Sequence, residues 1–137
     1  MKKKFCLIFA FMFLFLNVVQ FPTAASDIMP RSNNTLSTNT SFIITSGGNA
    51  IINLNYEGYP NVTTGATISI KIEKRVLLAF WTEVVSKTFT VTEYRYSTEF
   101  ICLLDKTGTY RCTVEYTISG TGGADDEITF QDTKTYG

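Results

Sequence analysis

Histidine is absent from this 137-residue sequence, and tryptophan occurs only once. Without an imidazole, the chain lacks the base of Ser-His-Asp and Cys-His catalysis and a common ligand of protein metal sites. No other catalytic motif is present. We therefore expect a non-enzymatic protein with no catalytic residue, no metal and no cofactor.

Basic residues are sparse beyond the N-terminus. The only basic run is Lys2–Lys4, so nucleic acid is not expected as a partner.

The first 25 residues have the three parts of a secretory signal peptide. Lys2–Lys4 carry positive charge, Phe5–Phe21 is almost entirely apolar, and Thr23–Ala25 supplies the small residues that a signal peptidase needs. We predict cleavage after Ala25 and a secreted, extracellular protein. The alternative is a retained membrane anchor, because about 17 apolar residues are near the minimum that spans a bilayer. Contact with a membrane is expected in that case only.

Cleavage would change both charge and cysteine content. The sequence has 12 basic and 12 acidic residues; without Lys2–Lys4, the mature chain has nine basic residues against twelve acidic ones, a net charge of −3. Cys6 leaves with the signal peptide, whereas Cys102 and Cys112 remain in an oxidising compartment. Both have the inward parity of their strands, which leaves open a disulfide between them or two buried free thiols.

The mature chain alternates between β-rich runs and turns. Residues 26–40 are polar and predict a flexible leader, and residues 41–137 predict the folded domain. The strongest alternation lies in 66–75 and 109–118, where apolar residues occupy every second position. The other β-rich runs are 41–45, 50–56, 81–87, 88–94, 97–104 and 127–134. This pattern predicts an all-β protein, an antiparallel two-sheet sandwich of about seven strands that follows a signal-peptide helix.

One motif narrows the fold. Tyr110 stands two residues before Cys112, and Asp105 and Gly108 supply turn residues ahead of it. Immunoglobulin-type domains carry a tyrosine corner at this spacing, in which the hydroxyl bonds to the backbone of the preceding loop. We therefore predict an immunoglobulin-like sandwich with Asp105, Gly108 and Tyr110 at a structural corner.

The chain resembles a family of short, uncharacterised secreted proteins of Gram-positive bacteria with an immunoglobulin-like domain. The resemblance covers roughly residues 40–134. It depends on a signal peptide before a single β domain, on Ile72–Arg75 followed by Trp81, and on Gly108–Arg111. It implies the fold and export, and it implies no functional site.

An apolar segment departs from that family, which usually has a polar turn before its tryptophan. Val76, Leu77, Leu78, Phe80 and Trp81 follow the basic pair 74–75. At the tip of a hairpin these side chains would be an exposed interface for a partner protein or a membrane surface. In a longer strand they would be core residues.

The acidic run 125–127 matches no Ca²⁺ loop pattern and predicts a solvated turn.

Our leading hypothesis is an exported, non-enzymatic binding or adhesion-type domain whose partner is an unknown extracellular protein or cell-envelope component. One alternative is a structural subunit that associates with itself through edge strands. Another is a small carbohydrate-binding module that uses Trp81 and surface tyrosines.

Overall fold

The computed structural model describes residues 32–137, and all of the regular structure in this range is β-strand. The predicted signal peptide, its helix and its cleavage site lie outside the described residues. The strands are β1 (Thr35–Ile44), β2 (Asn49–Gly58), β3 (Thr63–Val76), β4 (Phe80–Val91), β5 (Arg95–Leu103), β6 (Gly108–Gly120) and β7 (Asp126–Tyr136).

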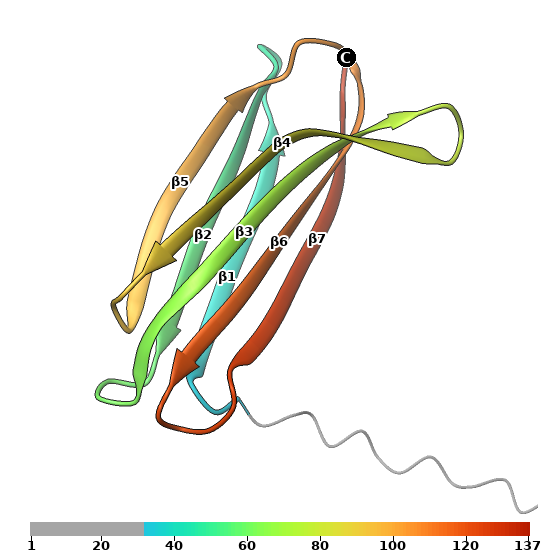
Figure 1. Ribbon diagram of the computed structural model, residues 1–137. Helices are drawn as coiled ribbons and strands as arrows, with labels where there is room; N and C mark the ends of the chain where they lie inside the picture. The colour runs from blue at the N-terminus through green and yellow to red at the C-terminus, as the bar shows by residue number, and fades with distance from the viewer. Residues whose placement is uncertain (1–31) are drawn as a thin grey trace, which may run out of the picture. The chain divides into compact units, whose positions relative to one another are not determined.

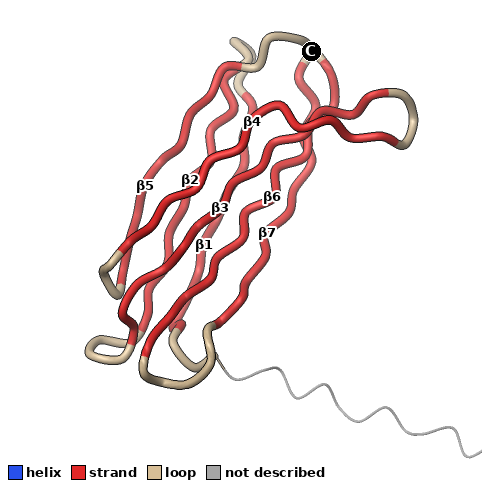
Figure 2. Tube along the Cα trace, viewed as in Figure 1, coloured by secondary structure: helices blue, strands red, loops and turns tan. Residues whose placement is uncertain are grey.

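The strands form two antiparallel sheets packed face to face (Figures 1 and 2). One sheet has the order β1-β2-β5 and the other has the order β4-β3-β6-β7. The chain crosses between the sheets from β2 to β3, from β4 to β5 and from β5 to β6. This arrangement confirms the predicted immunoglobulin-like, antiparallel two-sheet sandwich.

Two strand boundaries differ from the prediction. β1 begins at Thr35 and not at residue 41, because the polar residues 37–40 pair with 54–57 of β2. The runs 81–87 and 88–94 are largely one strand, β4, which pairs with β3 along most of its length. Polar Ser and Thr residues at a sheet edge satisfy the β-ladder as well as apolar residues do.

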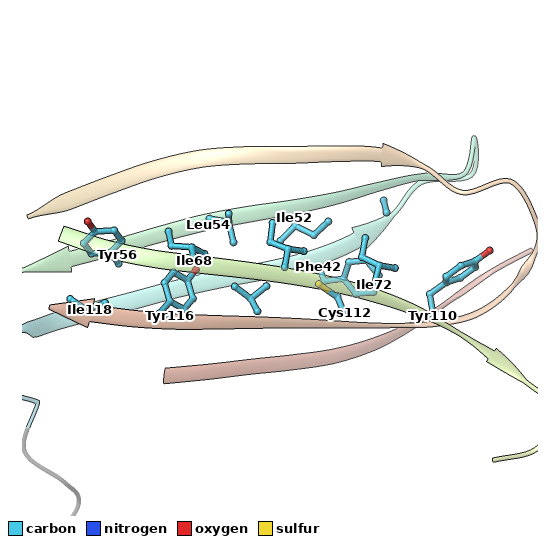
Figure 3. Packing of buried hydrophobic residues seen from close by; sticks show 14 of the residues in the cluster. Phe42, Ile52, Leu54, Tyr56, Ile68, Ile72, Tyr110, Cys112, Tyr116 and Ile118 are labelled. Atoms are coloured by element: carbon cyan, nitrogen blue, oxygen red, sulfur yellow. The ribbon is translucent and has the colours of Figure 1, made fainter. Parts of the chain in front are cut away.

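The core lies between the sheets and follows the period of two (Figure 3). On β3, Ile68, Ile70 and Ile72 are fully buried, and they pack with the inward residues of β2 and β6. On β6, the inward row includes Tyr110, Cys112, Val114, Tyr116 and Ile118.

The sandwich has two distinct ends. We call the end with turns 45–48, 77–79 and 104–107 the hairpin end, and the end with turns 59–62, 92–94 and 121–125 the entry end. The described chain enters at the entry end, at residues 32–34 (Figure 1). No helix in the described range has the length and apolarity needed to cross a membrane.

A buried asparagine ties the entry end together. Asn34 has no exposed surface, and its amide nitrogen donates to the carbonyls of Ala124 at 3.0 Å and Ile118 at 3.4 Å. Its side-chain oxygen accepts from the backbone N–H of Gly122 at 3.1 Å, and its backbone carbonyl accepts from the Thr63 hydroxyl. A buried amide that is satisfied in this way fixes the start of β1 against two other turns.

Candidate functional site

The β3–β4 hairpin extends beyond the rest of its sheet. Pairing of β3 with β6 ends at Lys74 and Tyr110, whereas pairing of β3 with β4 continues to Val76 and Phe80. The outer part of the hairpin is therefore a two-stranded ribbon, and it projects from the sandwich in Figure 1. Where the ribbon leaves the sheet, a β-bulge leaves Val84 of β4 without a pairing partner on β3. Bulges bend a strand, and they commonly redirect it next to functional sites.

The tip of this ribbon is apolar and open to solvent. Leu78 is 95% exposed, Leu77 is 82% exposed and Phe80 is 65% exposed, while Val76 is 40% exposed. Residues 77–79 form the turn. Of the two alternatives for this segment, the structure shows the exposed hairpin and not the core. We call residues 76–80 the apolar tip.

Leu77 has an unusual backbone conformation. Its φ is 55°, in the left-handed region, although it is neither glycine nor asparagine. A side chain with a Cβ loses about 1–2 kcal/mol there, and bulky residues are rare in this conformation. A leucine at this position thus strains the turn, and its exposed side chain gains no burial that would offset the strain.

Charged and aromatic side chains form the base of the hairpin. Arg111 of β6 donates to Glu73 Oε2 of β3 from Nε at 2.9 Å and from Nη2 at 2.7 Å. The Arg111 guanidinium carbon lies 4.4 Å from the centroid of the Trp81 ring, and that of Arg75 lies 5.2 Å from it. These are cation–π distances. Trp81 is therefore half-buried and held by two arginines.

The other side of the base contains the tyrosine corner. The Tyr110 hydroxyl donates to the carbonyl of Lys106 at 2.5 Å, which is the bond that such a corner requires. The Lys74 ammonium lies 5.6 Å from the Tyr110 ring centroid. Gly108 has a φ of 146°, which favours glycine, and a Cβ there would lie 2.7 Å from Lys74 Cε. Asp105 lies in the exposed turn before them.

Of the two alternatives for the cysteines, the structure shows free thiols and no disulfide. Cys112 is buried and Cys102 is half-buried. Their strands are offset across the sandwich: β5 contacts β4 through Phe100 and Phe89, whereas β6 is bonded to β1 through Tyr116 and Thr40. Burial, followed by the proximity of Cys102, raises the pKa of the Cys112 thiol to about 12.

The acidic turn forms hydrogen bonds to the residues that precede β1. The Asp126 carboxylate accepts from the backbone N–H of Asn33 at 2.8 Å and of Asn34 at 2.7 Å. Partial burial opposes its ionisation, but the hydrogen bonds outweigh that effect and hold the pKa of Asp126 below its ordinary value. Across residues 32–137, no cluster of three or more potential metal-ligating side chains occurs. Asp126 thus has a structural role that sequence reasoning missed.

A recess with a volume of about 390 Å³ lies at the entry end. It is lined by Asn55, Tyr56, Glu57, Glu93, Arg95, Tyr96 and Ser97. The Tyr56 hydroxyl already donates to the Glu93 carbonyl at 2.5 Å, which leaves exposed charged side chains around a shallow hollow. Two segments that lie far apart in the sequence, 55–57 and 93–97, form this recess, so no local sequence pattern predicts it.

The sequence predicts only part of the base of the hairpin. The sequence signals were the basic pair 74–75 and the apolar run after it, but the contribution of Arg111 depends on the strand order β4-β3-β6.

Comparisons of the chain with protein-family models and with curated proteins give no match. Function must therefore be argued from the site itself, since a sandwich fold alone does not specify one.

Proposed function

We propose that this protein is an exported, non-enzymatic binding domain that contacts its ligand through the apolar tip of the β3–β4 hairpin. The observation that carries the proposal is the exposure of Leu77 and Leu78, at 82% and 95%, on a ribbon that leaves the sandwich. Exposed apolar clusters on otherwise well-packed domains commonly mark interaction sites. The remainder of the molecule serves as a rigid support for the tip.

Export is the second part of the proposal. It depends on the N-terminal sequence, with Lys2–Lys4, the apolar run and the small residues before Ser26. The resemblance to secreted immunoglobulin-like proteins supports the same compartment. N-terminal sequencing of the protein from the culture medium should begin at, or within about two residues of, Ser26. A chain that stays with the cells and retains Met1 would contradict it.

Binding is tested with the double variant Leu77→Ser/Leu78→Ser. The purified protein is added to intact cells of the source organism, and the bound fraction is measured after washing. We expect the variant to lose most of its binding while its unfolding midpoint stays that of the native chain.

The matched control is Ile43→Thr/Ile101→Thr. These two isoleucines are 50% and 52% exposed on the outer face of the β1-β2-β5 sheet, so their replacement removes exposed apolar area far from the tip. Equal binding by the native chain and both variants would contradict the proposal.

The structure gives less support to a sugar-binding module. Trp81 is half-buried, and two guanidinium groups already lie on its ring. A stacking platform needs an accessible ring face. We therefore assign Trp81 to the base of the hairpin.

A further inference from the structure

We infer that the ligand of the apolar tip is the surface of an anionic lipid bilayer. The inference rests on the proposed function and names the chemistry of its ligand. It depends on how apolar, cationic and aromatic side chains are layered along one hairpin.

The layers follow the pairing of β3 with β4. The outermost residues, 76–80, are all apolar. The next pairs are Arg75 with Trp81 and Lys74 with Thr82, so the first charges below the tip are both positive. Below them, the carboxylate of Glu73 is paired with Arg111. Apolar groups at acyl depth, with Trp and basic residues at headgroup depth, are the arrangement that interfacial membrane segments adopt.

The charges of the whole domain favour one orientation. The entry end carries a group of acidic residues with Arg95 as the nearby cation: Glu57, Glu93, Asp125, Asp126 and Glu127. The base of the hairpin carries three cations, Lys74, Arg75 and Arg111. Arg111 neutralises Glu73, and Glu83 is exposed opposite Glu73, so the base has a net charge of +1. An anionic surface attracts basic residues within a Debye length and repels acidic ones. The domain would therefore approach such a surface with the hairpin first.

The chemistry of the tip favours lipid over a protein partner. None of the side chains from Val76 to Phe80 can donate or accept a hydrogen bond. Specific protein interfaces surround their apolar centre with hydrogen bonds, about one per 100–200 Å². A bilayer requires only apolar area and complementary charge. Because the turn carries backbone groups that lipid cannot satisfy, insertion is shallow and the contact is reversible.

Trp81 is a built-in reporter, because it is the only tryptophan in the sequence. Residues 32–137 form a compact unit with every strand of the sandwich, and the chain that begins at Ser26 contains this unit whole. This chain is titrated with vesicles of phosphatidylcholine, with or without phosphatidylglycerol. Some vesicles carry brominated acyl chains, which quench nearby tryptophan.

We expect the Trp81 emission to shift to the blue and to be quenched by brominated lipid on phosphatidylglycerol-containing vesicles. Leu77→Ser/Leu78→Ser should lower the partition coefficient at least about tenfold, because full burial of a single leucine already contributes about that much. Lys74→Gln/Arg75→Gln should lower it roughly fivefold per charge on anionic vesicles only. Ile43→Thr/Ile101→Thr is the control and should bind as the native chain does.

Three results would overturn the inference. The first is absence of partitioning onto either vesicle. The second is an equal loss of binding in the Ile43→Thr/Ile101→Thr control. The third is hairpin-dependent self-association in sedimentation without vesicle binding, which would identify a second copy as the occupant. If cells bind the protein through the tip but protein-free vesicles do not, the lipid inference fails and the proposed function stands. If neither binds, both fail.

Discussion

Arg111 of β6 donates two hydrogen bonds to one carboxylate oxygen of Glu73 on β3, at 2.9 and 2.7 Å. Both side chains are largely shielded, with 26% and 12% of their surfaces exposed. The pair lies where β3 and β4 leave the sheet, next to Trp81. It therefore anchors the projecting ribbon to the sandwich.

The first prediction concerns this pair. Arg111→Ala should lower the free energy of unfolding by about 1–3 kcal/mol, because it removes charge-assisted hydrogen bonds and a cation–π contact. It should also speed amide hydrogen exchange in residues 73–82, measured by mass spectrometry. Lys71→Ala is the control, since its ammonium lies 3.9 Å from Glu73 and is half-exposed, and it should change stability by less than about 0.5 kcal/mol. Similar losses in both variants would contradict the anchoring role.

The second prediction concerns the strained turn. Leu77→Gly should leave the free energy of unfolding unchanged or raise it by up to about 1 kcal/mol, because glycine adopts a φ of 55° without strain. Leu78 has no left-handed φ, so Leu78→Gly should cost about 0.5–1 kcal/mol. Urea unfolding measures both values. A loss in Leu77→Gly as large as that in Leu78→Gly would show that the turn is not strained.

The third prediction concerns acid stability. Because the pKa of Asp126 is held below its ordinary value of 3.8, its stabilising contribution is complete above that pH. The contribution is lost as the pH falls through the folded-state pKa, because the folded carboxylate must then take up a proton. Asp126→Asn should destabilise the protein by about 1–3 kcal/mol at neutral pH and flatten the acid limb of stability against pH.

Asp125→Asn is the neighbouring control, because Asp125 is exposed and no hydrogen bond to its side chain is observed within residues 32–137. Thermal unfolding from pH 7 to pH 2 should separate the two variants. Parallel curves for Asp126→Asn and Asp125→Asn would contradict the assigned role of Asp126.

The fourth prediction concerns the thiols. With its pKa at about 12, Cys112 is protonated in the folded protein at neutral pH and should react with iodoacetamide far more slowly than after unfolding. Its contribution to stability is complete below the unfolded thiol pKa of about 9 and is lost as the pH rises towards 12. Mass spectrometry after alkylation should find two reactive thiols in the unfolded, unreduced chain that begins at Ser26, because Cys6 is absent from it. Two thiols that resist alkylation until reduction would establish a disulfide and contradict the structure.

Much of the fold can be predicted from local sequence patterns. The alternation of Ile68, Ile70 and Ile72 determines the inward face of β3, because successive side chains of a strand point to opposite faces. Tyr110 is predictable from its spacing to Gly108 and Cys112. Asn34 was not predictable, since a polar residue before a strand suggests a flexible leader. The bonding partners of its side chain and carbonyl lie 29 to 90 residues farther along the chain, on β3, on β6 and in the turn 121–125.

The apolar tip shows most clearly what the sequence alone determined. The sequence gives this segment its composition, its place after a basic pair and the parity that would continue the core face through Val76. Whether the segment is core or surface depends on how far β6 and the opposite sheet extend, and β6 pairing stops at Lys74. Only the tertiary structure decides that, because burial is a property of the elements that cover a strand and not of the strand itself. The two cysteines show the same division. Alternation along each strand predicts that Cys102 and Cys112 point inward, but the offset between β5 and β6, which belong to different sheets, keeps them as free thiols.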